Sequence, residues 1–183
     1  MWSWFGRNEV QIKIIFAIVA AMYVVFEYRM NVWDDKISRT LDYIKQYNSG
    51  EILEASVSLN SFWISDEATN FFTNVTPENY TREIIMLIIE KQWYDEIYKL
   101  HNFYSDLSMC ANNSICDVDT ACEFFFDDIQ SFRETYRVFL EDVSGKWGED
   151  ISSEVQTFVK TRCQTQFKSY CTELPESPYC KPR

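Results

Sequence analysis

An unbroken apolar run near the amino terminus, residues 14–26, constrains this chain more than any other feature. Extended to residues 10–28, the run has only three polar interruptions, of which Lys13 is long enough to reach the headgroups. That length lies at the short end of what a transmembrane helix requires. Aromatic residues, which favour the two membrane interfaces, flank the run on both sides: Trp2, Trp4, Phe5, Tyr28 and Trp33. We therefore predict one transmembrane anchor within residues 1–30.

A cleaved signal peptide is the alternative to a retained anchor. Signal-peptide cleavage requires small residues after the apolar run, but this run ends Val24-Val25-Phe26-Glu27. The sequence therefore favours an uncleaved anchor that stays in membrane lipid.

Three small residues, Ala17, Ala20 and Ala21, lie inside the anchor. Ala17 and Ala21 have the four-residue spacing that lets a second transmembrane helix approach closely, so the three are candidate helix-packing residues. Alanine in an ordinary apolar helix is the simpler interpretation, and both remain open.

The remainder of the chain has the pattern of helices. Four Gly and four Pro in the whole sequence are too few for many strands joined by tight turns. Apolar residues after the anchor recur at three-to-four-residue spacing up to about Tyr47. A Thr-Pro pair predicts a helix start near Pro77, and Gly145 and Gly148 predict a helix end. We expect the first helix to end near Tyr47 and four more to cover about 51–72, 77–110, 117–143 and 149–171.

These elements predict an all-α fold, in which the transmembrane helix continues into an up-and-down bundle of about five helices. Residues 31–173 form one acidic helical domain, and residues 174–183 form a tail. The third helix is apolar on nearly all sides at residues 84–89, so it is expected to be central. Its predicted buried residues are Ile85, Leu87, Ile88 and Trp93. The adjacent acids Asp127-Asp128 mark a point where the fourth helix can be interrupted.

All six cysteines follow residue 109: Cys110, Cys116, Cys122, Cys163, Cys171 and Cys180. If the helices alternate away from and back to the membrane, the cysteines gather at the pole distal to it. An even number at one pole favours disulfides, which are typical of an oxidising compartment. Free buried thiols and metal or redox chemistry remain alternatives, although the spacing fits no common zinc pattern. A bridge to Cys180 requires the tail after Pro175 to fold back over the helix ends.

Charge and motifs argue against several classes of function. From Met30 onward there are 26 acidic and 14 basic residues, the opposite of a nucleic-acid-binding surface. His101, the one histidine, is best interpreted as a hydrogen-bonded core residue. Five acidic residues lie close together in the sequence: Asp117, Asp119, Glu123, Asp127 and Asp128. Their spacing lacks the alternating ligands and the glycine of a calcium loop, so they are better interpreted as acids at the start of a helix. No phosphate loop or activated serine is present. We expect no enzymatic activity, no cofactor and no bound metal.

Three segments, residues 100–108, 115–119 and 124–137, carry a resemblance to a known family. The chain resembles a widespread bacterial family of unknown function, whose short members have one N-terminal transmembrane helix and a C-terminal helical domain. The resemblance covers roughly residues 29–137 and implies no catalytic residues. The cysteines and the tail after Arg162 depart from the family pattern. More distantly, the layout is similar to a small pore-forming membrane protein encoded beside some RNA-targeting CRISPR nucleases.

Orientation and function are the last expectations. Positive charge on the two sides of the anchor is nearly balanced and leans slightly towards a cytoplasmic domain, but the cysteines favour a periplasmic or otherwise extracytoplasmic one. We expect a single-pass protein of the inner (cell) membrane, a non-catalytic accessory or scaffold subunit. Its domain would bind a membrane protein complex or a second copy. A homo-oligomeric membrane effector, such as a pore in phage defence, is the alternative but needs a polar strip along the anchor. A redox enzyme would need reduced, reactive cysteines.

Overall fold

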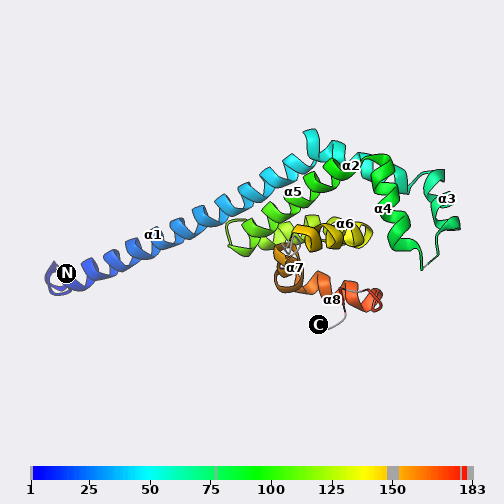
Figure 1. Cartoon of the computed structure of the whole chain (residues 1–183). Helices are drawn as coiled ribbons and strands as arrows, with labels where there is room; N and C mark the ends of the chain where they lie inside the picture. Colours follow the sequence, from blue (N-terminus) through cyan, green and yellow to red (C-terminus); the bar gives the residue numbers. More distant parts are fainter. Residues whose placement is uncertain (1, 77, 148–152, 178, 181–183) are drawn as a thin grey trace.

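The computed structural model describes the backbone of residues 2–76, 78–147, 153–177, 179 and 180, and the side chains of these residues except 2–12 and 143–147. Over this part of the chain the fold is all-α, as predicted, and no strand occurs (Figure 1). The described helices are more numerous than expected, because three of the expected helices are divided: α1 Trp2–Tyr47, α2 Gly50–Trp63, α3 Asp66–Asn74, α4 Tyr80–Lys91, α5 Tyr94–Asn112, α6 Val118–Trp147, α7 Ser153–Thr157, the π-helical turn η1 Phe158–Arg162 and α8 Gln164–Glu173.

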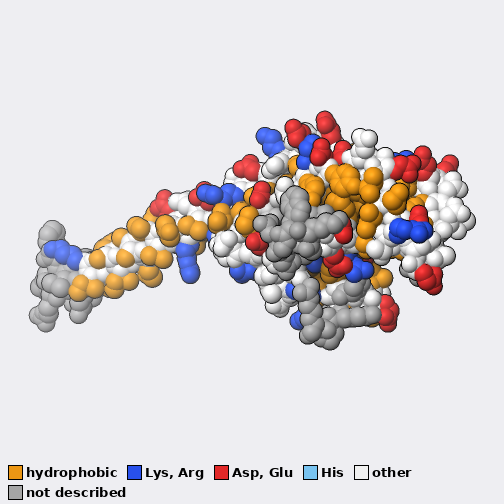
Figure 2. Space-filling view, in the orientation of Figure 1, with side chains coloured by type: hydrophobic (Ala, Val, Ile, Leu, Met, Phe, Trp, Pro, Cys, Tyr) orange, Lys and Arg blue, Asp and Glu red, His pale blue; other side chains and the backbone are white. Residues whose placement is uncertain are grey.

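Helix α1 runs without a break from the N-terminal region into the domain, and its first half projects from the molecule as a single rod (Figure 1). The large apolar side chains of residues 14–26 are all more than half exposed, between 52% and 70%. Figure 2 shows them as a continuous apolar surface. By length and composition, α1 is the one helix among the described residues that could cross a membrane. Tyr28 and Trp33 are also exposed, and the side chains of Trp2, Trp4 and Phe5 lie outside the described residues.

The second half of α1 is part of the domain. Thr40 is fully buried, and Tyr43, Ile44 and Tyr47 pack against the core. The helix ends near Tyr47, as predicted, and the chain turns at Gly50, whose φ of +60° favours glycine. Because one helix carries both the apolar run and core residues, the domain is held rigidly at the end of the rod.

The single helix expected over residues 51–72 is wrong, because the chain breaks after Trp63. Ser65 has an extended backbone, with ψ of 163°, and its hydroxyl donates to the carbonyl of Phe62 over 2.6 Å. Asp66 and Glu67 then occupy the first turn of α3, where the helix dipole favours negative charge. The break brings Phe71 back against Phe62, with ring centroids 6.4 Å apart.

The single helix expected over residues 77–110 is also wrong. Gln92 adopts a left-handed conformation, with φ of 59°, and its N–H closes α4 on the carbonyls of Ile88 and Ile89. Buried Trp93 begins the turn into α5. At the other end, α4 starts at Tyr80, and the predicted start residue Pro77 lies outside the described residues.

Helix α4 is peripheral, which corrects the expectation that residues 84–89 are central. Leu87, Ile88 and Trp93 are buried as predicted, but Ile85 is only partly buried. Met86 and Ile89 are exposed on the outer side of α4. The central helix is α5, which buries eight side chains, including the expected core residue His101.

Helix α6 is longer and more regular than expected. It continues through Asp127-Asp128 and through Gly145 to Trp147, while Gly148 lies outside the described residues. The carboxylate of Asp117 accepts the N–H of Thr120 over 2.9 Å and so caps the first turn, which confirms the helix-start interpretation for this acid. The helix expected over residues 149–171 is divided at Cys163 into α7 with η1 and α8, and residues 149–152 lie outside the described part.

Candidate functional site

All six cysteines are paired in three disulfides: Cys110–Cys116, Cys122–Cys163 and Cys171–Cys180. The pairing confirms the preference for disulfides over free thiols. The second bridge joins the start of α6 to the end of η1 and is buried in the core cluster. The other two close short segments, the turn between α5 and α6 and the C-terminal tail.

The position of the first bridge contradicts the expected distal pole. The N–H of Asp117, next to Cys116, donates to the hydroxyl of Thr40 over 2.9 Å and contacts the carbonyl of Lys36. Lys36 and Thr40 lie on the stretch of α1 between the apolar run and the domain centre. Figure 1 shows that α2 leads away from the apolar rod and that α5 runs back towards it, the reverse of the expected directions. This cysteine pair therefore lies at the end of the domain nearer the apolar rod.

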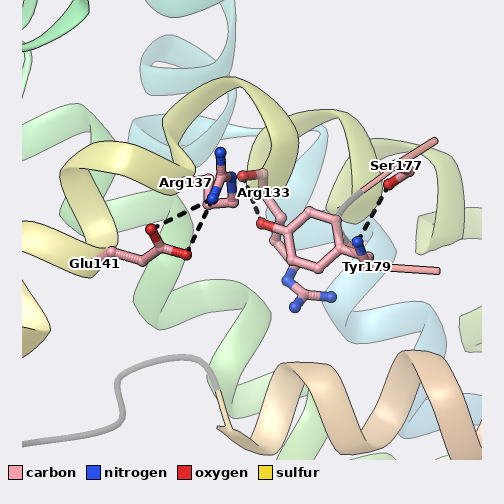
Figure 3. A network of polar contacts seen from close by, with 5 residues as sticks. All are labelled: Arg133, Arg137, Glu141, Ser177 and Tyr179. Atoms are coloured by element: carbon pink, nitrogen blue, oxygen red, sulfur yellow. Dashed lines mark hydrogen bonds and ion pairs between the residues drawn. The ribbon is translucent and has the colours of Figure 1, made fainter. Parts of the chain in front are cut away.

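The C-terminal tail folds back, as a bridge to Cys180 requires, but it lies on the middle of α6 and not over the helix ends as expected. The hydroxyl of Tyr179 donates to the carbonyl of Arg133 over 2.9 Å, and the Arg133 guanidinium stacks 4.1 Å from the Tyr179 ring centre (Figure 3). Ser177 donates to the carboxylate of Glu134 over 2.6 Å. These contacts explain how a short polar tail stays docked on the helix.

The three small residues of the predicted packing face, Ala17, Ala20 and Ala21, are exposed on the projecting half of α1. None of that segment is covered by the described remainder of the chain. The structure therefore leaves their role as helix-packing residues a prediction.

An apolar stripe on α2 is exposed in addition to the rod. Leu53 and Val57 are four residues apart and share one face of α2, and Ile64, the residue that directly follows the helix, extends this apolar surface beyond its C-terminal end. Leu53 is 40% exposed, Val57 57% and Ile64 89%. The opposite face of α2 packs on α5 through Ala55 and Leu59, so this stripe is directed outward.

A cleft of about 330 Å³ lies where the end of α1 meets α2, α5 and α6. Much of its lining is aromatic: Tyr47, Trp63, Phe72, Tyr104, Phe132 and Tyr136. The Trp63 indole N–H donates to the Tyr136 hydroxyl over 3.0 Å, which fixes both rings. Burial raises the pKa of Tyr136 to about 12, so this hydroxyl is neutral at physiological pH.

Asp128 is the one acidic residue in the lining of this cleft, which contains no lysine, arginine or histidine. Burial raises the pKa of its carboxyl, a hydrogen bond from Tyr47 lowers it, and the charge of neighbouring Asp127 raises it further. No lysine or arginine of the described chain forms an ion pair with it. The cleft is therefore an aromatic pocket with one carboxyl group that has no ion-pair partner among the described residues.

Sequence reasoning named Asp128 only as one of five acids and missed the cleft. A signal was present on α6, where Asp128, Phe132, Thr135 and Tyr136 follow at helical spacing and so share one face. The other acids do not join it to form a metal site, and the described residues contain no group of three or more potential His, Cys, Asp or Glu ligands.

The fold and its surfaces define an all-α domain on a projecting apolar helix, stapled by three disulfides. No protein-family model, curated protein or solved structure matches this chain. The bacterial family resemblance therefore stays a prediction.

Proposed function

We propose that this chain is a non-catalytic, single-pass membrane accessory or scaffold subunit whose helical domain binds a partner protein complex. The exposed stripe of Leu53, Val57 and Ile64 carries the proposal. Apolar side chains on one helix face lose their contact with water when a partner helix or groove covers them, and burial of each stabilises the complex by roughly 1.5–3 kcal/mol.

The continuous helix α1 supports a scaffold. One helix carries both the apolar run and residues of the domain core, buried Thr40 and partly buried Tyr47, so no flexible linker separates the two. The distance from Phe26 to Tyr47 along the helix is about 30 Å at 1.5 Å per residue. The stripe on α2 is thus presented at a fixed height above the membrane surface.

We expect Val57→Asp to abolish partner contact, because it places a charge in the centre of the stripe. A photo-crosslinking amino acid at Ile64, activated in cells, measures that contact as an adduct of defined mass after mild detergent extraction. The control is Thr69→Asp, which adds the same charge at an exposed position on α3. An adduct at Ile64 that survives Val57→Asp, or no adduct in the parent protein, contradicts the proposal. An adduct of twice the chain's own mass identifies a second copy as the partner and supports the homo-oligomeric alternative.

The cellular placement proposed with this function is the inner membrane, with the domain outside the cytoplasm. The three disulfides support it, because cytosolic thiols are kept reduced. We expect intact spheroplasts treated with an impermeant phosphine reductant and an impermeant maleimide to be labelled at Cys171 and Cys180, the more accessible pair. Replacement of both by serine should remove most of the label. Labelling that appears only after lysis contradicts this placement.

A further inference from the structure

We propose that the cleft between α1, α2, α5 and α6 binds a small organic cation, with Asp128 as its counter-ion and the aromatic side chains as the surface on which its charge and its carbon skeleton rest. Such a ligand site lies apart from the outward stripe of α2 and adds a sensing function to the proposed scaffold. Its evidence comes from charge, ring geometry and size.

The charge of the cleft selects a cation. Asp128 is half-buried and lacks a basic ion-pair partner among the described residues. A partly desolvated carboxylate without a counter-ion is costly to the folded protein, and a bound ammonium offsets that cost. An anionic ligand would face this carboxylate and the acidic surface of the whole domain, so its binding is disfavoured.

The rings of the cleft form adjoining walls. The Tyr104 and Phe132 centroids lie 5.4 Å apart, and those of Phe132 and Tyr136 lie 5.2 Å apart. Trp63 adds a further wall 6.5 Å from Tyr136. Aromatic faces attract ammonium groups through the ring quadrupole, and a carboxylate beside several rings is a typical environment for an amine.

Size and position narrow the ligand further. A volume of about 330 Å³ is at the lower end of small-molecule pockets, and it suits a small amine rather than a folded partner. The cleft includes Tyr47, at the end of α1 remote from the apolar run. With about 30 Å of helix in between, the amine comes from solution and not from a lipid headgroup.

The test uses the full chain in a neutral detergent and isothermal titration with three cations: phenethylammonium, choline and putrescine. The charge-reversed control ligand is 3-phenylpropionate. We expect at least one cation, phenethylammonium first, to bind with a 1:1 stoichiometry and 3-phenylpropionate not to bind. Binding of none of the three cations, or equal affinity for phenethylammonium and 3-phenylpropionate, overturns the proposal.

Two variants and one control assign the binding to this cleft. Asp128→Asn should weaken cation binding at least tenfold, while Asp127→Asn, which removes the same charge from the exposed neighbour, should change it less than twofold. Ser131→Lys places an ammonium at an exposed position one turn from Asp128 and should also weaken binding tenfold, by acting as an internal counter-ion. Equal losses in Asp127→Asn and Asp128→Asn, or unchanged binding in Ser131→Lys, overturn the proposal.

A structural role for Asp128 predicts a different result. Because the pKa of its carboxyl is raised in the folded protein, the ionised form opposes folding at every pH above that pKa. Asp128→Asn should therefore leave the unliganded protein's melting temperature at pH 7 unchanged or higher while binding is lost. A lower melting temperature together with unchanged cation affinity shows that Asp128 serves the fold alone, which also overturns the proposal.

Discussion

Simultaneous replacement of Cys122 and Cys163 by alanine is expected to lower the free energy of unfolding by about 4 kcal/mol. The two cysteines are 41 residues apart in sequence and join the start of α6 to the end of η1. A disulfide stabilises mainly by restricting the unfolded chain, and for a loop of this length the chain-entropy relation gives roughly 4 kcal/mol. That is a large fraction of the 5–15 kcal/mol that typically holds a domain together.

Urea unfolding of the full chain in detergent, followed by near-ultraviolet circular dichroism, measures this loss. The matched control is the double alanine variant of Cys110 and Cys116, which are only 6 residues apart, so the same relation gives roughly 2 kcal/mol. Equal losses in the two double variants would mean that loop length does not set the contribution of these bridges.

Phe125→Ala is expected to cost about 3–5 kcal/mol, the range for a large aromatic removed from a packed core. Phe125 is fully buried, and its ring lies edge-on to Tyr47 of α1 at 5.5 Å and to Phe103 of α5 at 5.7 Å. The side chain thus joins α1, the central helix α5 and α6. Its loss leaves a cavity at the point where α1 is fixed to the domain.

Phe124→Ala is the control for this variant. Phe124 stands next to Phe125 on α6 but is 43% exposed, so its replacement should cost less than half as much. Thermal unfolding by circular dichroism compares the two variants at equal protein concentration. Equal destabilisation would falsify the assignment of Phe125 to the junction of α1, α5 and α6.

The helices expected over residues 51–72 and 77–110 are each divided in the structure, and the two breaks differ in how well the local sequence predicts them. At residues 51–72 a signal was present, since Ser65 followed by Asp66 and Glu67 is a typical helix start. At residues 77–110 the sequence contained no such signal, because glutamine does not normally adopt the left-handed conformation that Gln92 has. Burial of Trp93 in the core holds Gln92 in that conformation, and this constraint comes from contacts distant in sequence.

The sequence by itself determined the all-α class, the apolar run of residues 14–26, the end of the first helix near Tyr47 and the fold-back of the tail that a bridge to Cys180 requires. Each of these depends on composition, helical spacing or the reach of the chain, which are local quantities. Only the tertiary structure decided the direction of α5, the disulfide partners and the cleft around Asp128. The chain turns into α5 at Gln92, whose left-handed conformation no local pattern predicts. The partner of Cys122 and the aromatic lining of the cleft come from helices that are distant in sequence, so only their packing brings these residues together.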